Sequence, residues 1–489
     1  MRIIEKLAIA NRGEVSVRII RACQELGIET VLLHSEADKD TLAYRLCDER
    51  VCIGPAPVQQ SYLNIEANIN GAKSVGADAI HPGFGFLSEN ANFAEACEQN
   101  NLIFVGPSAK SIRLFGDKIS AKNLVQDLNI PTIPGYQGEN QDLEHLLAKA
   151  QEVGYPLMVK AAAGGGGRGL KIVTGADGAR TGIEAAQREG LSAFGSAKVF
   201  LEKYIARAKH IEVQIFGDAS GHVFHLFERD CSVQRRHQKV IEESPGASLS
   251  ESVRQKLLDA AVRIARKADY RGAGTVEFLV DGDEFYFMEM NTRLQVEHPV
   301  TEAVVGVDLV KAQIQTAQEQ SLLWAQADLR LRGHAIECRV YAEDPYRGGI
   351  PSCGKITYCQ WPVGPGRRFD CGFDIDDVVT PHYDSMLAKV IVWDETRVRA
   401  IERMKQALRE TIVFGVYTNI PYLLAILEHP DFVSGEMTTR FIEQNFAKGL
   451  NLASVNSVSE NFLKIIQNMS QSDPQPVVNP WFRKSGELL

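Results

Sequence analysis

Two short runs on either side of an Asp-Gly-Asp-Glu stretch dictate what the centre of this chain can become. Residues 274–291 read GTVEFLVDGDEFYFMEMN, and apolar and polar side chains alternate in both halves. Alternation with period two is typical of strands, and a glycine-containing turn between two such runs indicates a β-hairpin. Because further alternating runs with hairpin-like turns surround it, we predict an α+β region with an antiparallel sheet.

The length of the hairpin turn decides which face Glu277 occupies. A two-residue Asp281-Gly282 turn sends Glu277 and Glu289 to opposite faces, because side chains alternate with every residue. A three-residue turn over 282–284, or a bulge, places them directly opposite each other. Facing carboxylates repel unless a cation lies between them, and oxygen ligands of this kind suit Mg²⁺ on nucleotide phosphates. We therefore predict a metal site, to which Asn291 can add a ligand; the alternative is a solvated hairpin face.

The alternating pattern continues beyond the hairpin into TRLQVEHPV. Arg293 and Gln295 extend the polar line and offer hydrogen-bond donors to a small planar anion. Glu297 is a carboxylate that can accept a proton from that anion. A continuous strand would spread these polar groups over about 26 Å, so we expect the chain to bend after Asn291.

The order of patterns along the chain predicts three folded regions and a tail. Residues 1 to about 115 alternate strand-like and amphipathic helical runs, which is typical of a doubly wound α/β domain. The first strand-to-helix turn is Asn11-Arg12-Gly13-Glu14, so the GxGxxG dinucleotide fingerprint is absent. Residues 120–330 form the α+β region, and residues 334–446 form a third region that ends in a long helical stretch. Residues 447–489 are polar with prolines, which indicates a loosely ordered tail.

Composition limits the classes of function. The 489 residues are 45% hydrophobic and 24% charged, as in soluble globular proteins. The net charge of −9 argues against a broad nucleic-acid-binding surface, so any anion site must be a local basic pocket. No apolar run reaches the roughly 20 residues of a membrane span, and the N-terminus lacks a signal-peptide pattern. Nine scattered cysteines without a CxxC pair indicate reduced thiols and a cytoplasmic protein.

A run of four glycines lies in KAAAGGGGRGL, residues 160–170. Consecutive glycines destabilise both helix and strand. The segment is therefore a flexible hinge or hairpin tip, or a mobile loop whose N–H groups close over phosphates. Lys160 before the loop and Arg168 within it favour the phosphate interpretation. No GxxxxGK[ST] sequence occurs in the chain, so the loop is not a P-loop.

The stretch LEKYI, residues 201–205, ends a strand-like run. Its aromatic and aliphatic pair beside exposed backbone could hold a flat heterocycle, although an edge strand that meets a loop is the commoner meaning of such a sequence. His210 follows shortly, and a lone histidine is more often structural than functional. Both interpretations stay open for these residues.

Five basic side chains crowd ERDCSVQRRHQKV, residues 228–240. A run of charges is usually a solvated face. Here glutamines and a histidine are interleaved and a strand-like run leads directly in, so a pocket for an anion is the favoured interpretation. The basic side chains are Arg229, Arg235, Arg236, His237 and Lys239.

Seven motifs follow one another along the chain: NRGE, HPGFGFLSEN, KAAAGGGGRG, ERDCSVQRRHQK, EMNTRLQVEHPVTE, HAIECRVYAEDP and HYDSMLAK. Together they resemble biotin carboxylase, a member of the ATP-grasp superfamily, over residues 1 to about 446. The resemblance implies an N-terminal α/β domain, a central ATP-grasp domain with a glycine-loop lid at about 132–204, and a C-terminal biotin carboxylase domain. It also implies a ligase that uses ATP to convert bicarbonate to carboxyphosphate and then carboxylates the N1′ atom of biotin.

The resemblance assigns a role to each motif residue. Nucleotide contacts would come from Lys118, Lys160, Gly166, Gly167, His210 and His237, and the adenine would be bordered by Glu202, Lys203, Tyr204 and Ile205. Mg²⁺ or Mn²⁺ would be held by Glu277, Glu289 and Asn291. Bicarbonate would be bound by Lys239, Arg293, Gln295 and Val296. Glu297 would act as the base on bicarbonate, and Arg339 would stabilise the biotin enolate.

Arg339 lies in HAIECRVYAED, where alternation places Glu337 and Arg339 on one face of a strand and the apolar residues on the other. The simple alternative is an ion pair with a neighbouring acid, worth about 0–1 kcal/mol if it is exposed. The resemblance implies instead that the guanidinium offsets negative charge that develops on the ureido oxygen of biotin.

Two features depart from the family pattern or bear on its partners. Phe84 stands in HPGFGFLSEN where the family often has tyrosine, which puts a hydroxyl contact near biotin in question. The family's biotin acceptor carries a Met-Lys-Met-like motif on a separate small β domain. The only Met-Lys here, Met404-Lys405, lies in a helical, charged stretch. The resemblance thus implies a separate biotin carboxyl carrier protein, carboxyltransferase subunits as further partners, and a homodimer.

The segment FGVYTNIPYLLAILEHPDF, residues 414–432, resembles acyl-CoA carboxylase versions of the family. The predicted function is the first half-reaction of an acyl-CoA carboxylase, with acetyl-CoA or a related acceptor, as in fatty acid biosynthesis. One alternative is another ATP-grasp ligase that forms an acyl phosphate, such as carbamoyl phosphate; Arg339 and HYDSMLAK argue against it. The other is a non-catalytic nucleotide-binding subunit, which would be expected to have lost Glu297, Lys239 or Arg293.

Overall fold

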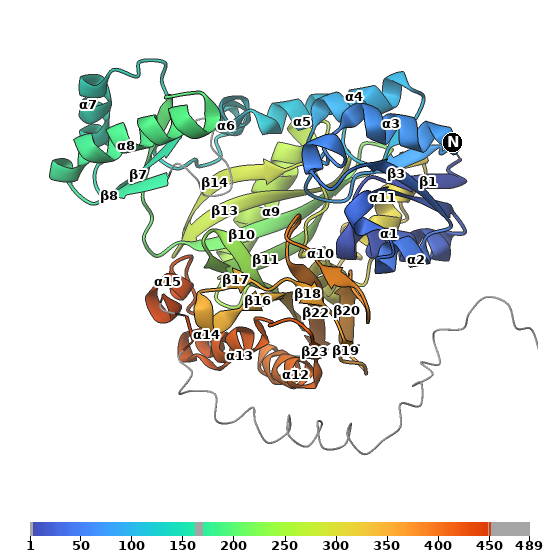
Figure 1. The fold of residues 1–489 in the computed structure, drawn as a ribbon. Helices are drawn as coiled ribbons and strands as arrows, with labels where there is room; N and C mark the ends of the chain where they lie inside the picture. Colours follow the sequence, from blue (N-terminus) through green and yellow to red (C-terminus); the bar gives the residue numbers. More distant parts are fainter. Residues whose placement is uncertain (1–2, 162–169, 448, 451–489) are drawn as a thin grey trace, which may run out of the picture.

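The structure is a computed structural model that describes residues 3–161, 170–447 and 449–450. A central sheet lies between the N-terminal domain and a small outlying sheet, and the C-terminal helices lie below it in Figure 1. Gly166, Gly167, Arg168 and the predicted tail from 451 onward lie outside the described residues. Within the described ranges, no helix is long and apolar enough to cross a membrane.

The N-terminal domain is built on five short strands: β1 (Lys6–Ile9), β2 (Glu29–Ser35), β3 (Glu49–Gly54), β4 (Ala79–His81) and β5 (Ile103–Phe104). They pair in parallel in the order β3-β2-β1-β4-β5. The helices are α1 (Gly13–Leu26), α2 (Leu42–Leu46), α3 (Ile65–Ser74), α4 (Ala91–Gln99) and α5 (Ala109–Gly116). Leu7 and Ile9 belong to the apolar core formed with α1, whereas Ala8 belongs to the core formed with α3 and α4. Helices therefore cover both faces, as predicted for a doubly wound domain.

The second sheet, which we call the lid (residues 135–203), has four antiparallel strands: β6 (Gly135–Tyr136), β7 (Leu157–Ala161), β8 (Leu170–Val173) and β9 (Val199–Lys203). Their order is β6-β9-β7-β8. The helices α7 (Leu143–Val153) and α8 (Ala176–Phe194) pack on it, and α6 (Lys118–Asp127) precedes it. Leu146, Ile183 and Leu201 are fully buried in a core that belongs to this sheet alone. Figure 1 shows the lid standing away from the rest of the chain.

Eight antiparallel strands form the central sheet: β10 (Lys209–Gly217), β11 (Val223–Arg235), β12 (Gln238–Ser244), β13 (Gly272–Asp281), β14 (Glu284–Asn291), β15 (His334–Tyr341), β20 (Arg367–Cys371) and β22 (Met386–Asp394). Their order is β14-β13-β10-β11-β12-β15-β22-β20. Because β12 pairs with β15, one sheet continues across the boundary predicted at 330–334. The antiparallel sheet predicted from the alternating runs is thus confirmed, and it extends beyond the central region.

Helices divide the central sheet into an apolar and a polar face. Ile211 and Val213 of β10 pack with α9 (Glu251–Lys267), so His210 and Glu212 face the other way. In the same manner the apolar residues of β15 pack with α12 (Arg397–Glu410) and α13 (Ile420–Glu428), which leaves Arg339 on the polar face, as predicted. That face is covered in part by α10 (His298–Val305), which is followed by α11 (Leu309–Ala317). The polar side chains of several strands are therefore gathered on one side.

The C-terminal region adds short elements around this sheet. They are β16 (Glu343–Asp344), β17 (Ile350–Pro351), β18 (Gly354–Lys355), β19 (Tyr358–Gln360), β21 (Val378–Val379), β23 (Ile412–Phe414), α14 (Pro430–Ser434) and α15 (Phe441–Phe446). Met404, of the Met-Lys pair, lies inside α12 and is fully buried. A helix interior of this kind does not present the neighbouring lysine on a turn.

The hairpin at 274–291 turns differently from the three-residue turn that we predicted. Asp281 pairs with Glu284, so the turn has two residues, and Gly282 adopts the positive φ of 61° that a tight hairpin turn favours. The three-residue turn is therefore wrong, whereas the bulge that we gave as the other possibility is confirmed. A β-bulge in β14 supplies the extra residue instead, and Glu277 lies directly opposite Glu289, as predicted.

Candidate active site

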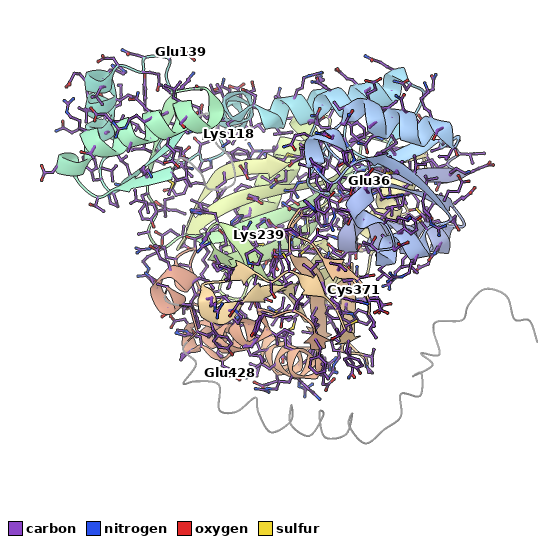
Figure 2. All side chains as sticks on the ribbon, in the orientation of Figure 1. Glu36, Lys118, Glu139, Lys239, Cys371 and Glu428 are labelled. Atoms are coloured by element: carbon purple, nitrogen blue, oxygen red, sulfur yellow. The ribbon has the colours of Figure 1, made fainter. Side chains whose placement is uncertain are left out.

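One cavity of about 1450 Å³ is lined by every described residue to which the family resemblance assigns a role. Its walls come from the polar face of the central sheet, the inner side of the lid, loops of the N-terminal domain and the helix α15. Figure 2 places Lys239 near the centre of the molecule and Lys118 where the lid joins the body. Gly166 and Gly167 are outside the described residues, so their predicted contacts stay predictions.

Lys239 on β12 is the centre of the charged part of this cavity. Its Nζ lies 2.5 Å from Glu212 Oε2, 2.9 Å from Glu277 Oε1 and 2.6 Å from Glu297 Oε1. Burial disfavours the cation, but the three carboxylates outweigh burial and hold the pKa of Lys239 well above its usual value. The ammonium group is therefore a permanent positive charge at the cavity wall.

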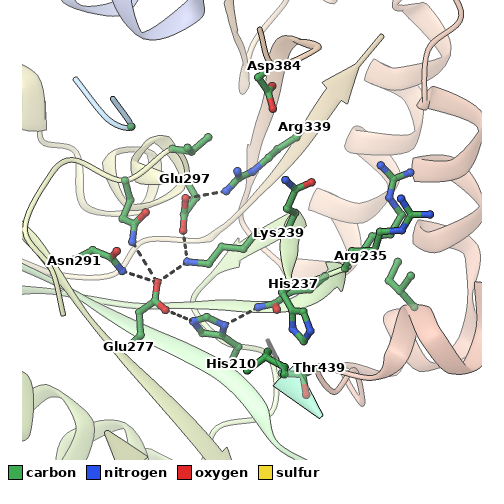
Figure 3. Close-up of a pocket in the computed structure, with 18 of the residues that line it drawn as sticks. His210, Arg235, His237, Lys239, Glu277, Asn291, Glu297, Arg339, Asp384 and Thr439 are labelled. Atoms are coloured by element: carbon green, nitrogen blue, oxygen red, sulfur yellow. Dashed lines mark hydrogen bonds and ion pairs between the residues drawn. The ribbon is translucent and has the colours of Figure 1, made fainter. Parts of the chain in front are cut away.

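Glu297 lies between two cations and has no exposed surface. Arg339 Nη2 donates to Glu297 Oε2 at 2.9 Å, and Lys239 donates to the other carboxylate oxygen (Figure 3). Arg339 Nε also donates to Glu242 at 2.6 Å. Burial alone would raise the pKa of Glu297, but Lys239 and then Arg339 lower it well below its usual value. In this arrangement Glu297 is ionised and is a weak base. Any anion that draws Lys239 or Arg339 away would strengthen it as a base.

Glu277 and Glu289 face each other at the other end of the same polar line. Glu277 accepts hydrogen bonds from Lys239 and from Asn291 Nδ2, each at 2.9 Å, and its other oxygen lies 3.0 Å from His210 Nε2. Burial would raise the pKa of Glu277, but Lys239 and His210 lower it, so the carboxylate is ionised. Desolvation by the surrounding protein, followed by the charge of Glu277, raises the pKa of Glu289. An added cation would relieve this repulsion, so the oxygen donors of this pair and of Asn291 fit Mg²⁺ or Mn²⁺.

The chain leaves the strand where we predicted. β14 ends at Asn291 and α10 begins at His298, so the intervening residues turn back over the polar face. Arg293 donates to Gln295 Oε1 at 2.7 Å and to Glu89 Oε2 at 3.0 Å. The guanidinium therefore lies against the cavity within reach of the groups around Glu297.

The outer part of the cavity carries the residues predicted to bind the nucleotide. Lys160, at the end of β7, forms a 2.5 Å ion pair with Glu202 on the neighbouring strand β9. Tyr204 and Ile205 follow β9 and line the cavity beside them. Across the cavity, His237 lies in the tight β11–β12 turn with a φ of 63°, and its side chain is labelled in Figure 3.

Several residues of this site were missed in the sequence. Glu212, Glu242 and Glu89 hold Lys239, Arg339 and Arg293, respectively. A signal for Glu212 was present, because it shares one strand face with His210 in the run HIEVQIFG. Glu242 and Glu89 give no comparable signal, since their neighbours are distant in the sequence.

The basic run at 228–240 is divided by the structure. Arg235, Arg236, His237 and Lys239 line the cavity, as an anion pocket requires. Arg229 does not line it. Its guanidinium has no exposed surface and binds Glu212, Gln214, Thr275 and Thr301 beneath the cavity floor. This part of the prediction is wrong, because alternation along β11 does not reveal which end of the strand is buried.

Three family models match successive parts of the chain. They describe the biotin carboxylase N-terminal domain (residues 3–112), the ATP-binding domain of the carbamoyl-phosphate synthase L chain (117–324) and the biotin carboxylase C-terminal domain (337–444). Biotin carboxylase 1 of Bacillus subtilis is 50% identical over 442 residues, which cover 90% of this chain and 98% of that protein. This chain belongs to the biotin carboxylase family. It is an ATP-grasp ligase, and the predicted fold class is confirmed.

Further relatives place the same unit in larger enzymes. The alpha subunit of mitochondrial methylcrotonoyl-CoA carboxylase from Glycine max is 47% identical over 458 residues, which cover 93% of this chain and 62% of that subunit. The biotin carboxylase domain dimer of the 2-oxoglutarate carboxylase from Hydrogenobacter thermophilus, solved with MgADP, ADP and bicarbonate, is 44% identical with a TM-score of 0.87. That match covers 91% of this chain and 98% of the solved chain.

Proposed function

We propose that this chain catalyses the ATP-dependent carboxylation of biotin on a separate carrier protein, the first half-reaction of an acyl-CoA carboxylase. The observation that carries the proposal is the position of Glu297, between Lys239 and Arg339 and in the same cavity as the facing carboxylates Glu277 and Glu289. One cavity thus has a metal and phosphate end, a base, and an arginine beyond the base. ATP would bind at the metal and phosphate end, bicarbonate beside the base, and biotin beside the arginine.

The nucleotide would occupy the lid side of the cavity. Tyr204 and Ile205 would border the adenine, with Glu202 and Lys203 beside them, and Lys118, Lys160, His210 and His237 would contact the nucleotide, as would Gly166 and Gly167. Glu277, Glu289 and Asn291 would hold Mg²⁺ or Mn²⁺, which supplies charge neutralisation at the phosphates. Lys160 must first exchange Glu202 for a phosphate, because the two side chains form an ion pair in this structure. A closed lid would keep water away from carboxyphosphate.

Bicarbonate would bind among Lys239, Arg293, Gln295 and Val296, and Glu297 would take its proton. The lowered pKa of Glu297 fits this role only if the arriving anion shares Lys239 and Arg339. Lys239 and Arg339 would then stabilise the ionised form of Glu297 less, so the pKa of Glu297 would rise. The carboxylate would thus become a stronger base once bicarbonate is bound.

Carboxyphosphate would then break down to CO₂ and phosphate, and the phosphate would accept the N1′ proton of biotin. Arg339 would offset the negative charge that develops on the ureido oxygen of biotin. Phe84 lines the same cavity and has no hydroxyl to add to that stabilisation.

Three kinds of partner belong to this proposal: a biotin carrier, carboxyltransferase subunits and a second copy of this chain. Met404-Lys405 is inside α12, which supports a biotin carrier on another chain. Carboxyltransferase subunits would pass the carboxyl group to acetyl-CoA or a related acceptor, and the catalytic unit would be a homodimer in the cytoplasm. The methylcrotonoyl-CoA carboxylase relative supports an acyl-CoA acceptor.

Phosphate release with bicarbonate, measured with and without free biotin, tests the proposal. We expect bicarbonate-dependent ATP cleavage that free biotin stimulates. Cleavage that ammonia stimulates and biotin does not would favour a carbamoyl-phosphate-forming ligase. MgADP binding without any turnover would favour a non-catalytic nucleotide-binding subunit.

A further inference from the structure

Lys389 is a buried lysine that no step of the proposed reaction uses. It lies on β22, has no exposed surface, and its Nζ donates a 2.7 Å hydrogen bond to the main-chain carbonyl of Val296. Two carboxylates flank the same ammonium group: Glu14 at 3.3 Å and Asp370 at 3.8 Å. A charge in this position is costly unless it is well paired, so its place beside the catalytic residues calls for an explanation.

The contacts of Lys389 join three parts of the chain. Glu14 lies in the first turn of α1 in the N-terminal domain, and Val296 lies in the segment between β14 and α10. Lys389 is opposite Arg339 of β15 and opposite Asp370 of β20 in the sheet register. Directly opposed residues share a sheet face, so Lys389 points to the same side as Arg339.

The bonded carbonyl has a particular place in the site. It belongs to the peptide group that joins Val296 to Glu297, and Glu297 occupies the N-cap position of α10 without a capping hydrogen bond from its side chain. The strand has already ended at Asn291, so no sheet ladder holds this peptide. Lys389 fixes it, and thereby fixes both the backbone of Val296 and the start of the Glu297 side chain.

The charge on Lys389 is maintained by its surroundings. Burial lowers the pKa of Lys389, but Glu14, Glu337 and Asp370 outweigh burial and raise it. Burial raises the pKa of Glu14 to about 7, against the opposing effect of Lys389. The ammonium group therefore keeps its donors, while Glu14 is protonated more easily than Asp370, whose pKa is lowered by Arg368 and Lys389 in spite of burial.

We propose that Lys389 and Glu14 are positioning residues for Glu297: they hold the Val296–Glu297 peptide in place and tie the N-terminal domain to the catalytic base. This inference rests on the proposed function. Lys389 does not line the cavity, and Glu14 lines it but is not among the residues predicted to bind bicarbonate or nucleotide. Substitution of either residue should therefore change the position of the Glu297 carboxylate relative to bicarbonate and leave nucleotide binding intact.

The test compares Lys389→Met with a matched control, Arg397→Met. Arg397 on α12 likewise forms an ion pair with a buried carboxylate, Glu243, at 2.7 Å, and donates to the carbonyl of Phe432 at 2.7 Å, but it does not line the cavity. We expect Lys389→Met to lower kcat of bicarbonate-dependent ATP cleavage by about 10²-fold, the usual cost of a misplaced group. KM for bicarbonate should rise while KM for ATP stays within about twofold. The control should lose thermal stability and keep kcat.

Glu14→Gln provides a second, milder variant, because glutamine keeps the shape of the side chain. We expect a loss of kcat of roughly tenfold, with MgADP affinity unchanged by calorimetry. Folded variants with wild-type kcat and bicarbonate KM, or an equal loss of kcat in the Arg397→Met control, would overturn the positioning role. A wild-type protein that releases no phosphate with bicarbonate would instead overturn the proposed function and this inference with it.

Discussion

Two buried charged clusters lie on either side of the Val296–Glu297 peptide, and they differ in what their charges face. The cavity cluster consists of Lys239, Glu277, Glu297 and Arg339. The support cluster consists of Glu14, Arg18, Glu302, Arg368, Asp370 and Lys389. Every member of the first lines the cavity, whereas the second, apart from Glu14, is packed between the N-terminal helix α1, α10 and the strands β20 and β22.

The difference shows how one protein can hold some charges in ion pairs that a substrate anion can replace and others in ion pairs that stay fixed. In the cavity cluster Lys239 binds three carboxylates at once, so a substrate anion can replace one of them without leaving the lysine unpaired. In the support cluster each cation binds a carboxylate of another domain, as Arg18 binds Glu302 at 3.0 Å. These cations do not line the cavity, so a substrate anion cannot replace their partners. Substitutions in the first cluster should change chemistry, and substitutions in the second should change position and stability.

Glu297→Gln should have the largest effect. Glutamine cannot take a proton from bicarbonate, so turnover should fall by roughly 10²–10⁴, the usual range for a lost general base. MgADP affinity, measured by calorimetry, should stay close to that of the wild type, because Glu297 lies beyond the metal pair. Unchanged turnover would show that Glu297 is not the base. It would also contradict the expectation that substitutions in the cavity cluster change the chemistry.

Arg339→Ala should separate the two half-reactions. The arginine would meet charge that appears only when biotin loses its proton, so biotin carboxylation should lose about 3 kcal/mol of barrier lowering, by analogy with oxyanion-hole donors. Bicarbonate-dependent ATP cleavage should be retained in large part. Both activities would be measured on one preparation with the fold checked by circular dichroism. Equal loss of the two would place Arg339 in the nucleotide half-reaction.

Glu289→Gln tests the metal end of the cavity cluster. Loss of one carboxylate should raise the Mg²⁺ concentration needed for half-maximal ATP cleavage by roughly tenfold, because one hard oxygen ligand is weakened. The readout is a Mg²⁺ titration at saturating bicarbonate, with Glu284→Gln at the exposed hairpin turn as the matched control. A Mg²⁺ dependence identical to that of the wild type would show that the facing carboxylates do not bind the metal.

Glu302→Gln should have the smallest effect on turnover and a clear effect on acid stability. Burial would raise the pKa of Glu302, but Arg18 and Arg368 outweigh it and lower the pKa from 4.5 to about 2. A lowered pKa stabilises the folded state above about pH 4.5, and this stabilisation is lost as the pH falls toward 2. The variant should therefore melt earlier at pH 7 and show a flatter decline of Tm between pH 5 and 3. If turnover of the folded variant at pH 7 fell tenfold, Glu302 would belong with Lys389 and Glu14 among the positioning residues and would not act on stability alone.

Local patterns were enough to predict much of the fold and the site. The alternating runs predicted the strands, and the described residues to which the family resemblance assigns a role lie around one cavity. The bend after Asn291 could be foreseen because a straight strand cannot bring Glu289 and Glu297 to one substrate. Glu277 faces Glu289 as expected, although a bulge and not the turn produces the pairing. A bulge depends on how two strands fit together, and the sequence of either strand alone does not specify it.

Long-range partners could not be read from the sequence. Lys389 and Val296 are 93 positions apart, and Arg293 is 204 positions from Glu89. Lys389 lies in the motif HYDSMLAK, yet nothing in that motif indicates which carbonyl it binds. Arg229 shows the same limit, since a basic run does not reveal which of its members lies beneath the cavity floor.

The strand order of the central sheet has a consequence for synthesis of the chain. Until β15 has been made, β12 is an open edge, and the 90 positions from Ser244 to His334 separate the two strands. At about 5–20 residues per second, the edge waits roughly 5–20 s on the ribosome with unpaired backbone groups and the run KVIEES available to other chains. Cells that translate slowly, or lack chaperones that cover nascent strands, should therefore lose more of this protein to aggregation before its last strands emerge.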